Sequence, residues 1–316
     1  MLTENTPPCH PSWVGVDVGK ETLAIHIVAS NKALIVPNKA AAIKDFLRLN
    51  PQATLVLEST GGYEAEIIAL AIKAKHTVYR VNARRVRAFM ESVGIYAKTD
   101  AIDAKALADF AIANARYLHT FVLPTPEMKK LRQLARRRDE LIAMRTQETN
   151  RLKAPDNACL QASIKAVLKC FKAQIETAEK QLAEITKSSQ GLQEKIDVLT
   201  GVKGVGQVTA VNLLVAMPEL GQLNGKQVAS LAGLAPFPRD SGKKKGYRRT
   251  RGGRVEVRNA LYMAALSAAR YHDDIKIFYL RLIKNGKRPL QALIAVARKL
   301  LVILNAKLRD AALKTA

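Results

Sequence analysis

The sequence predicts an α/β amino-terminal domain, a helical middle with coiled-coil character and a mainly helical carboxy-terminal domain. Strand and helix signals alternate along the first third, a heptad of apolar residues runs through the middle, and helical periodicity dominates the last third. With 316 residues, 48% of them hydrophobic, the chain is long enough for more than one core. The predicted domains are residues 1–122, 123–195 and 196–316.

Short apolar runs predict five strands in the first domain. The first three follow one another through tight turns, and the last two alternate with helical segments. The strands span residues 13–20, 22–30, 33–36, 53–57 and 76–81. The helices span residues 39–49 and 63–75, a basic segment with Arg84, Arg85 and Arg87, and residues 100–115. This order predicts a mixed sheet covered by helices.

The middle of the chain has the heptad spacing of two helices that pack along each other. A charged helix is expected over residues 127–153, and Pro155 and Asn157 separate it from a second helix. Apolar residues of the second helix recur at alternating steps of four and three: Ile164, Leu168, Phe171, Ile175, Ala178, Leu182 and Ile185. The pattern predicts a helical hairpin or a coiled coil, formed within the chain or between protomers.

Glycine-rich segments and helices alternate in the last domain. A turn rich in glycine at residues 199–206 leads into a helix at residues 207–216, and residues 231–253 form a basic loop. Three further helices are expected over residues 255–271, 274–284 and 289–313.

The net charge of the chain indicates the kind of partner it binds. Fifty-one lysines and arginines against 27 acidic residues give a net charge of +24. Such a charge favours nucleic acid, because neutralised phosphates release counterions. An anionic membrane is the alternative, but the longest apolar stretch, residues 290–304, contains Arg298 and Lys299. We therefore expect no membrane partner.

The amino terminus and the cysteines favour the cytoplasm. Residues 1–12 lack the basic and apolar regions of a signal peptide. Cys9, Cys159 and Cys170 form no CxxC pair, so neither a disulfide framework nor a structural zinc site is expected. We expect a protein of the reducing cytoplasm.

Four acidic residues have the order and setting of a metal site. Asp17 lies inside an apolar strand, where a carboxylate is costly unless it is paired or metal-bound, and Glu58 ends another strand. Asp100 and Asp103 lie three apart at the start of a helix, hence on one face. Carboxylate oxygens suit Mg²⁺, and metal ions can stabilise both oxygens of a phosphodiester exchange.

Each carboxylate also has an ordinary structural explanation. Asp100 is suited to cap its helix, Asp103 to be a solvated first-turn acid, and Glu58 to be a surface residue at a strand end. Asp17 has the weakest such alternative, because its strand is otherwise apolar.

The glycine-rich turn is suited to grip a phosphate. Glycines let the chain turn closely, and the following helix directs its free N–H groups toward an anion. Lys203 adds a positive charge to the segment G-V-K-G-V-G. The alternative is an ordinary tight turn between two helices.

The basic loop predicts contact with nucleic acid. Nine basic and two acidic residues lie between Arg239 and Arg258, a net charge of +7, with glycines interspersed. A solvated basic loop is the usual meaning of a charge run, but this density favours phosphate contact. The predicted contacts are Arg239, Lys243, Lys244, Lys245, Tyr247, Arg248, Arg249, Arg251 and Arg254, together with Lys203.

Ser241 lies within this loop, in the segment R-D-S-G-K. The residues alone explain it as a turn serine, because D-S-G is ordinary turn chemistry. A nucleophilic serine needs a base or cationic surroundings that favour its alkoxide, and the neighbouring Lys and Arg residues are compatible with that.

Seven motifs in order give the chain a family resemblance. They are V-G-V-D-V-G-K, L-E-S-T-G-G-Y, K-T-D-A-I-D-A, G-V-K-G-V-G, L-A-G-L-A-P, R-D-S-G-K and G-G-R-V-E-V-R-N-A-L-Y-M-A-A. Together they resemble the DEDD transposases of bacterial insertion sequences, in the insertion-sequence family numbered one hundred and ten, which includes the Piv-type invertases. The resemblance covers residues 13–310.

The resemblance implies a fold, a site and partners. It implies a RuvC-like RNase H fold for the first domain, with Asp17, Glu58, Asp100 and Asp103 as the acidic positions that hold Mg²⁺. It also implies that Ser241 is the nucleophile of a transposase domain containing a helix-hairpin-helix. The implied partners are donor and target DNA and a structured guide RNA transcribed from the element, which pairs with both DNAs.

The hypothesis from the sequence is therefore a strand-exchanging recombinase that forms a homodimer or homotetramer. Its metal and serine sites would serve one reaction, within one protomer or across two. Two other functions stay open: a RuvC-type junction nuclease that uses water, and a nucleic-acid binder without catalytic activity.

Overall fold

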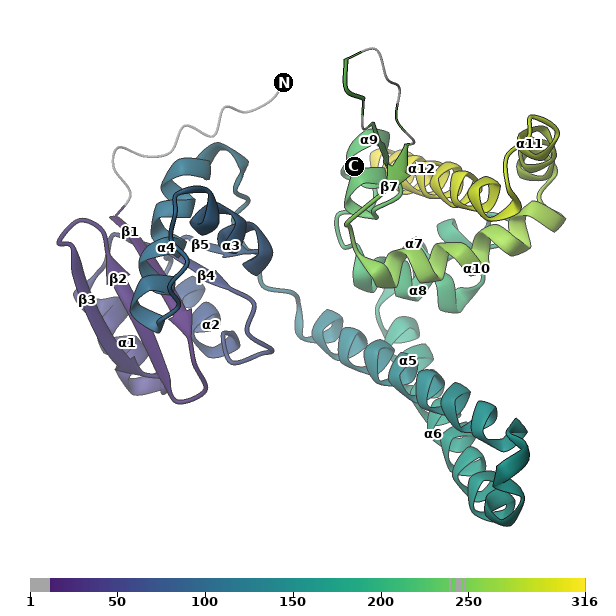
Figure 1. Ribbon diagram of the computed structural model, residues 1–316, viewed down its shortest axis with the longest axis horizontal. Coiled ribbons are helices and arrows are strands. Elements are labelled where there is room, and N and C mark those ends of the chain that lie inside the picture. The colour runs from purple at the N-terminus through teal and green to yellow at the C-terminus, as the bar shows by residue number, and fades with distance from the viewer. Residues whose placement is uncertain (1–11, 239, 243–245, 247, 316) are drawn as a thin grey trace. The chain divides into compact units, whose positions relative to one another are not determined.

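The computed structural model describes residues 12–238, 240–242, 246 and 248–315. Contacts within the chain divide it into two compact units, Met1–Pro124 and Thr125–Ala316 (Figure 1). The finer division expected near residue 195 stays a prediction.

The first unit is built on the mixed sheet that the sequence predicts. Its strands are β1 (Ser12–Val18), β2 (Thr22–Ile27), β3 (Lys32–Pro37), β4 (Ala53–Glu58) and β5 (Val78–Val81). They lie in the order β3-β2-β1-β4-β5. The first three strands pair antiparallel, whereas β4 pairs parallel to both β1 and β5. The C-terminal ends of β1 and β4 are therefore at the same edge of the sheet.

Two pairs of helices cover the two faces of this sheet. On one face, α1 (Ala40–Leu49) and α2 (Ala65–Lys73) pack on alternate residues of β1, β2 and β4. On the other face, α3 (Ala83–Ser92) and α4 (Asp100–Asn114) pack on the residues between them. Residues of one strand point alternately to the two faces, so every second residue of β1 faces α4.

The backbone of α4 lies directly on β1 because Gly15 has no side chain. A Cβ atom at this position would overlap the carbonyl oxygen of Ala104 and lie 2.9 Å from the backbone nitrogen of Ala108. The strand signal was clear from the sequence, but this close approach was not. It sets the height of α4 above the sheet.

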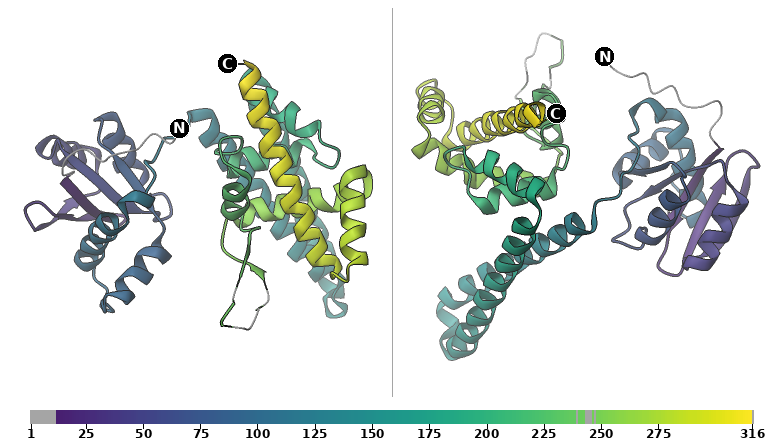
Figure 2. Two further views of the ribbon diagram at one scale, coloured as in Figure 1. Left: turned by 90° about the horizontal axis from the view of Figure 1, so that it is seen from above. Right: turned by 180° about the vertical axis from the view of Figure 1, so that it is seen from behind.

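The second unit begins with the predicted helical hairpin. Helices α5 (Pro126–Lys153) and α6 (Gln161–Ser188) are joined by a short 3-10 segment, η2 (Pro155–Leu160), and pack along each other (Figure 2). All seven residues of the heptad seam are buried or half-buried. The seam is therefore used within the chain, which favours the intramolecular alternative.

The base of the hairpin shares a core with the C-terminal helices. Leu131 of α5 and Leu182 of α6 belong to the same apolar cluster as residues of each later helix in this unit. These helices are α7 (Gln190–Thr200), α8 (Gln207–Ala216), α9 (Gly225–Leu231), α10 (Val255–Tyr271), α11 (Asp273–Lys284) and α12 (Pro289–Thr315). The short helix α9 was not predicted.

Helix α12 is the one described helix that is long and apolar enough to cross a membrane by length and composition. Leu300, Leu301 and Leu304 are fully buried in the core of the second unit. The apolar character of α12 is thus explained by its place in that core.

Replacing Gly15 by alanine should destabilise the first unit, because the new Cβ meets backbone atoms of α4 that have little freedom to move. We expect the free energy of unfolding to fall by about 1–3 kcal/mol or more. Trp13, the single tryptophan, packs against Tyr79 in this unit, so its fluorescence during urea denaturation reports the change.

Gly191→Ala is the matched control, since Gly191 lies in helix α7 with no atom within 4 Å of the added Cβ. An unchanged midpoint for Gly15→Ala would contradict the close packing of α4 on β1.

Candidate active site: an acidic cluster and a serine hairpin

Asp17 and Glu58 end neighbouring parallel strands. The register pairs Val16 of β1 with Leu57 of β4, so the next residues, Asp17 and Glu58, stand side by side. Val16 and Leu57 belong to the core under α1 and α2. By alternation, the two carboxylates are directed to the opposite face, which α4 covers.

The first turn of α4 brings the other two predicted acids to this face. Thr99 caps the helix, with its Oγ1 accepting a hydrogen bond from the N–H of Ile102 at 3.2 Å. Asp100 is therefore not the capping residue, and its explanation as a cap is wrong. Asp100 is exposed and Asp103 is half-buried.

The negative charges of these carboxylates act on one another's pKa. Burial raises the pKa of Asp17, and the negative charges of Asp103 and then Asp100 raise it further. Burial also raises the pKa of Glu58, followed by the charges of Asp17 and Asp103. Lys98 opposes the increase at both residues. The structure thus brings the four predicted acids into one electrostatic cluster and adds Lys98, which the sequence had not singled out.

The donor chemistry of this cluster fits a divalent cation. Among the residues that the structure describes, no three His, Cys, Asp or Glu side chains lie close enough together to hold an ion. Hard oxygen ligands are nevertheless what Mg²⁺ requires, and a cation would offset the repulsion that raises both pKa values.

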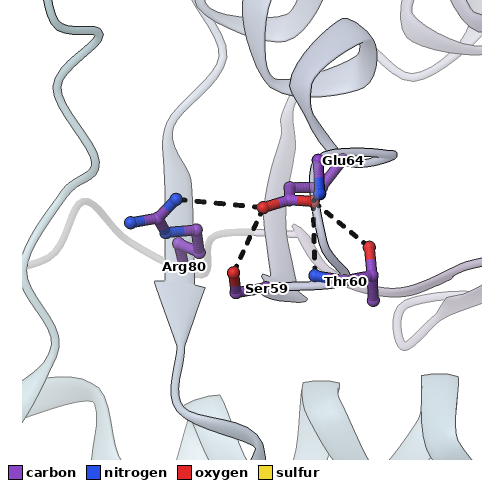
Figure 3. A network of polar contacts seen from close by, with 5 residues as sticks. Ser59, Thr60, Glu64 and Arg80 are labelled. Carbon is purple, nitrogen blue, oxygen red and sulfur yellow. Dashed lines mark hydrogen bonds and ion pairs between the residues drawn. The ribbon is translucent and has the colours of Figure 1, made fainter. Parts of the chain in front are cut away.

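A buried glutamate beside the cluster had no counterpart in the sequence analysis. Glu64, only 5% exposed, accepts hydrogen bonds from the Ser59 hydroxyl, the Thr60 N–H and hydroxyl, and the Gly62 N–H (Figure 3). Burial raises its pKa, but the hydrogen bonds outweigh this and hold the pKa below its usual range. A single Glu before a helix resembles an ordinary first-turn acid, so no pattern in the sequence distinguishes Glu64.

Ser241 is exposed in a small β-hairpin of the second unit. Strand β6 (Pro236–Phe237) pairs antiparallel with β7 (Arg249–Thr250). Asp240 connects the two sides of the loop between them: its carboxylate accepts from the Gly246 N–H at 3.1 Å and pairs with Arg248 at 3.2 Å. These contacts restrain the residue immediately before Ser241.

Three glycines anchor the base of this hairpin. Gly233, Gly252 and Gly253 all have φ near +70°, which a residue with a Cβ rarely adopts. A Cβ on Gly233 would overlap the Gly252 carbonyl oxygen, and one on Gly253 would overlap the Gly233 nitrogen. The motifs L-A-G-L-A-P and G-G-R therefore meet backbone to backbone at the base of the hairpin that contains Ser241.

The predicted nucleic-acid contacts differ in their surroundings. Arg239, Lys243, Lys244, Lys245 and Tyr247 lie outside the described residues. Arg248 is paired with Asp240, whereas Arg249, Arg251 and Lys203 are exposed.

Arg254 is engaged in a structural network instead. Its guanidinium donates to both carboxylate oxygens of Glu219 at 2.7 Å and to the Ala216 carbonyl at 2.8 Å. Although burial opposes it, this pairing lowers the pKa of Glu219. The geometry favours a structural role for Arg254 at the end of helix α8, a role that a basic run in the sequence conceals.

The glycine-rich turn between α7 and α8 packs on α10. Gly204 has φ +101°, and a Cβ there would lie 2.7 Å from backbone atoms of Ala268. Helix α8 begins after Gly206 without a side-chain cap. Its first N–H groups are available to an anion, as the sequence predicts for a phosphate grip.

The acidic cluster and the serine hairpin lie in two segments of the chain that match known protein families. Residues 14–155 match the model of the DEDD transposases of the IS110 type, described as "Transposase". Residues 196–280 match the model described as "Transposase IS116/IS110/IS902 family". The chain belongs to the IS110 family of transposases. The membership confirms the resemblance and assigns the protein to the enzymes of transposition and recombination.

Relatives of this IS110 family member match almost end to end. The pilin gene-inverting protein of Moraxella bovis is 28% identical over 318 residues, covering 95% of this chain and 96% of that protein. An uncharacterized 42 kDa protein of insertion element IS900 from Mycobacterium paratuberculosis is 25% identical, with the same shares covered.

One solved structure is similar to part of the transposase chain. The T. thermophilus RuvC structure in complex with Holliday junction substrate is matched over 34% of this chain and 99% of that chain, with 11% identity and a TM-score of 0.28. At this score the similarity carries no argument.

Replacing Asp17 by asparagine should stabilise the first unit at neutral pH. The folded pKa of Asp17 lies above the unfolded value of about 3.9, so its ionisation opposes folding. Stability should fall as the pH rises from the unfolded to the folded pKa, and Asp17→Asn should remove this part of the fall. Each kcal/mol regained raises Tm by roughly 2–4 °C.

The measurement is thermal unfolding followed by Trp13 fluorescence between pH 4 and pH 8, with the exposed Asp45→Asn as control. Identical pH profiles for Asp17→Asn and the unmodified protein would contradict the raised pKa.

Proposed function

We propose that this protein is a strand-exchanging DNA recombinase in which Ser241 is the nucleophile and the acidic cluster assists the reaction. The observation that carries the proposal is that Asp17 and Glu58 end neighbouring parallel strands on the sheet face that α4 covers, and that the first turn of α4 contains Asp100 and Asp103. The strand order of the first unit, with α4 covering one face of its sheet, is what we expect of an RNase H-like, RuvC-like domain.

The exposed hairpin supports the role of Ser241. In the proposed reaction, Oγ of Ser241 bonds to the phosphorus of a DNA phosphodiester while the bond from phosphorus to one deoxyribose oxygen breaks. The serine hydroxyl loses its proton, and the leaving oxygen gains one. Attack by the hydroxyl of the other DNA strand reverses both changes, releases Ser241 and completes exchange without an external energy source.

Negative charge develops on the phosphate oxygens during this exchange, and a cation held by the acidic cluster would stabilise it. Asp17, Glu58, Asp100 and Asp103 would hold Mg²⁺, which when bound supplies a positive charge that stabilises those oxygens. Lys98 is an exposed cation in electrostatic contact with Asp17 and Glu58, so it is suited to a phosphate of the bound strand.

The charge of the chain supports donor and target DNA as partners. The net charge of +24 and the exposed Lys203, Arg249 and Arg251 suit phosphate contacts. The pilin gene-inverting relatives are named for inverting a gene, and we propose a related rearrangement here. A structured guide RNA, assembly as a homodimer or homotetramer and a place in the bacterial nucleoid complete the proposal.

Ser241→Ala and Asp100→Ala should each abolish recombination while DNA binding survives. Ser241→Ala removes the nucleophile, so no protein–DNA adduct forms; Asp100→Ala removes one ligand of the metal site. Recombination of a reporter plasmid and denaturing gels for the covalent adduct measure the two effects. Ser230→Ala and Asp156→Ala, at exposed positions outside both sites, are the controls and should retain activity.

The two alternative functions give different outcomes. If water is the nucleophile, Ser241→Ala still cleaves DNA and no adduct is trapped from either protein. If the chain only binds nucleic acid, neither adduct nor cleavage occurs with Mg²⁺ present, and chelation leaves binding unchanged.

RNA guidance predicts that one defined RNA encoded next to the gene copurifies with the protein and restores recombination when added back. Sequencing of the bound nucleic acid and reconstitution with the transcribed RNA test this. A random sample of cellular RNA, together with full activity after ribonuclease treatment, would overturn the guide hypothesis but leave the serine mechanism standing.

A further inference from the structure

Two polar residues outside the acidic cluster tie together the chain segments that carry it. One is Glu64, which lies immediately before α2, and the other is Asn38, which lies between β3 and α1. Both direct their hydrogen bonds to the segments that follow Asp17 and Glu58.

Glu64 fixes the segment after Glu58. Its carboxylate accepts four hydrogen bonds of 2.9–3.3 Å from donors in residues 59–62. These are the first four residues beyond Glu58. Figure 3 shows Ser59, Thr60 and Arg80 directed toward the same carboxylate. A buried charged group that accepts this many bonds holds its donors in one arrangement.

Arg80 extends this network to the next strand. Its guanidinium lies 3.9 Å from the Glu64 carboxylate, and its backbone is in register with Leu57, the residue before Glu58. The same guanidinium lies over the ring of Phe121 at 4.6 Å. Glu64 therefore connects the end of β4 with β5 as well as with its own loop.

Asn38 joins the segment after Asp17 to the segment after Glu58. Its Nδ2 donates to the carbonyl of Gly19 at 2.9 Å and to the carbonyl of Tyr63 at 3.3 Å. Gly19 lies two residues beyond Asp17, and Tyr63 ends the segment that Glu64 holds. One amide group thus connects the ends of the two strands that carry the first two acids.

Asn38 and Glu64 precede α1 and α2, the two helices on the sheet face opposite α4. Any effect on Asp17 or Glu58 therefore passes through the backbone between them. Such outer partners set the orientation of the groups that do the binding.

We propose that Glu64 and Asn38 are positioning residues that hold the ends of β1 and β4 in the arrangement in which Asp17 and Glu58 bind a divalent cation together. This inference rests on the metal site of the proposed function. It adds Glu64 and Asn38 to the residues on which that metal site depends. Their role is to fix the spacing of the carboxylates through the loops, in addition to the sheet.

The test measures the affinity of the full chain for Mn²⁺ alone, by electron paramagnetic resonance of the free ion. Glu64→Ala and Asn38→Ala should each weaken binding about tenfold or more. Glu64→Gln should weaken it less, because the amide oxygen still accepts bonds from residues 59–62 although it no longer pairs with Arg80. Glu66→Gln is the matched control, an exposed glutamate of the same helix, and should bind as the unmodified protein does.

Thermal unfolding followed by Trp13 fluorescence identifies which variants are folded at the assay temperature. Should Glu64→Ala fail to fold, Glu64→Gln and Asn38→Ala carry the test. Folded Glu64 and Asn38 variants that bind Mn²⁺ as tightly as the unmodified protein would overturn the positioning role.

Asp17→Asn separates this failure from failure of the metal site itself. If Asp17→Asn loses Mn²⁺ binding while the Glu64 and Asn38 variants keep it, only the positioning role is wrong. If Asp17→Asn also binds normally, Mn²⁺ does not bind at the acidic cluster, and both the metal site and the positioning role are overturned.

Discussion

The first unit depends on one close contact, the backbone of α4 lying on β1 at Gly15. Because no Cβ separates them, the first turn of α4 reaches the level of Asp17, and Asp103 comes within electrostatic range of two strand-end carboxylates. A bulkier residue at this position would lift the helix and disperse the charges. The first glycine of V-G-V-D-V-G-K, Gly15, thus has a direct role in assembling the acidic cluster.

This assembly concentrates negative charge in a protein with a large positive excess. Desolvation and mutual repulsion raise the pKa values of Asp17 and Glu58, so the folded state carries an electrostatic strain at this edge. Sites of this kind are typical of function, since a bound cation turns the same repulsion into affinity. Nearby, Glu64 shows the opposite behaviour: its charge is fully hydrogen-bonded and its pKa is lowered.

In the second unit, backbone and side-chain contacts hold in place the basic loop that contains Ser241. Backbone contacts among three glycines fix the base of the hairpin, and Asp240 restrains its two sides. Arg254 anchors the exit of the loop to Glu219 and to the C-terminal end of α8. Some of the positive charge is therefore structural, while exposed residues such as Arg249 and Arg251 are available to phosphates.

The strands, most helices, the basic charge and the four acidic candidates could be predicted from the sequence, because periodicity, composition and motif order are local properties of the chain. Tertiary structure decided what depends on contacts between distant residues. Asp240 and Arg254 both belong to a charged loop, yet Arg254 pairs with a carboxylate 35 positions away. Thr99 caps the helix in place of Asp100, and Asn38 donates to the carbonyls of Gly19 and Tyr63, which are distant in sequence and come together only in the fold. Local patterns identify which groups are present, but only the packed fold fixes the distances through which their charges and hydrogen bonds act.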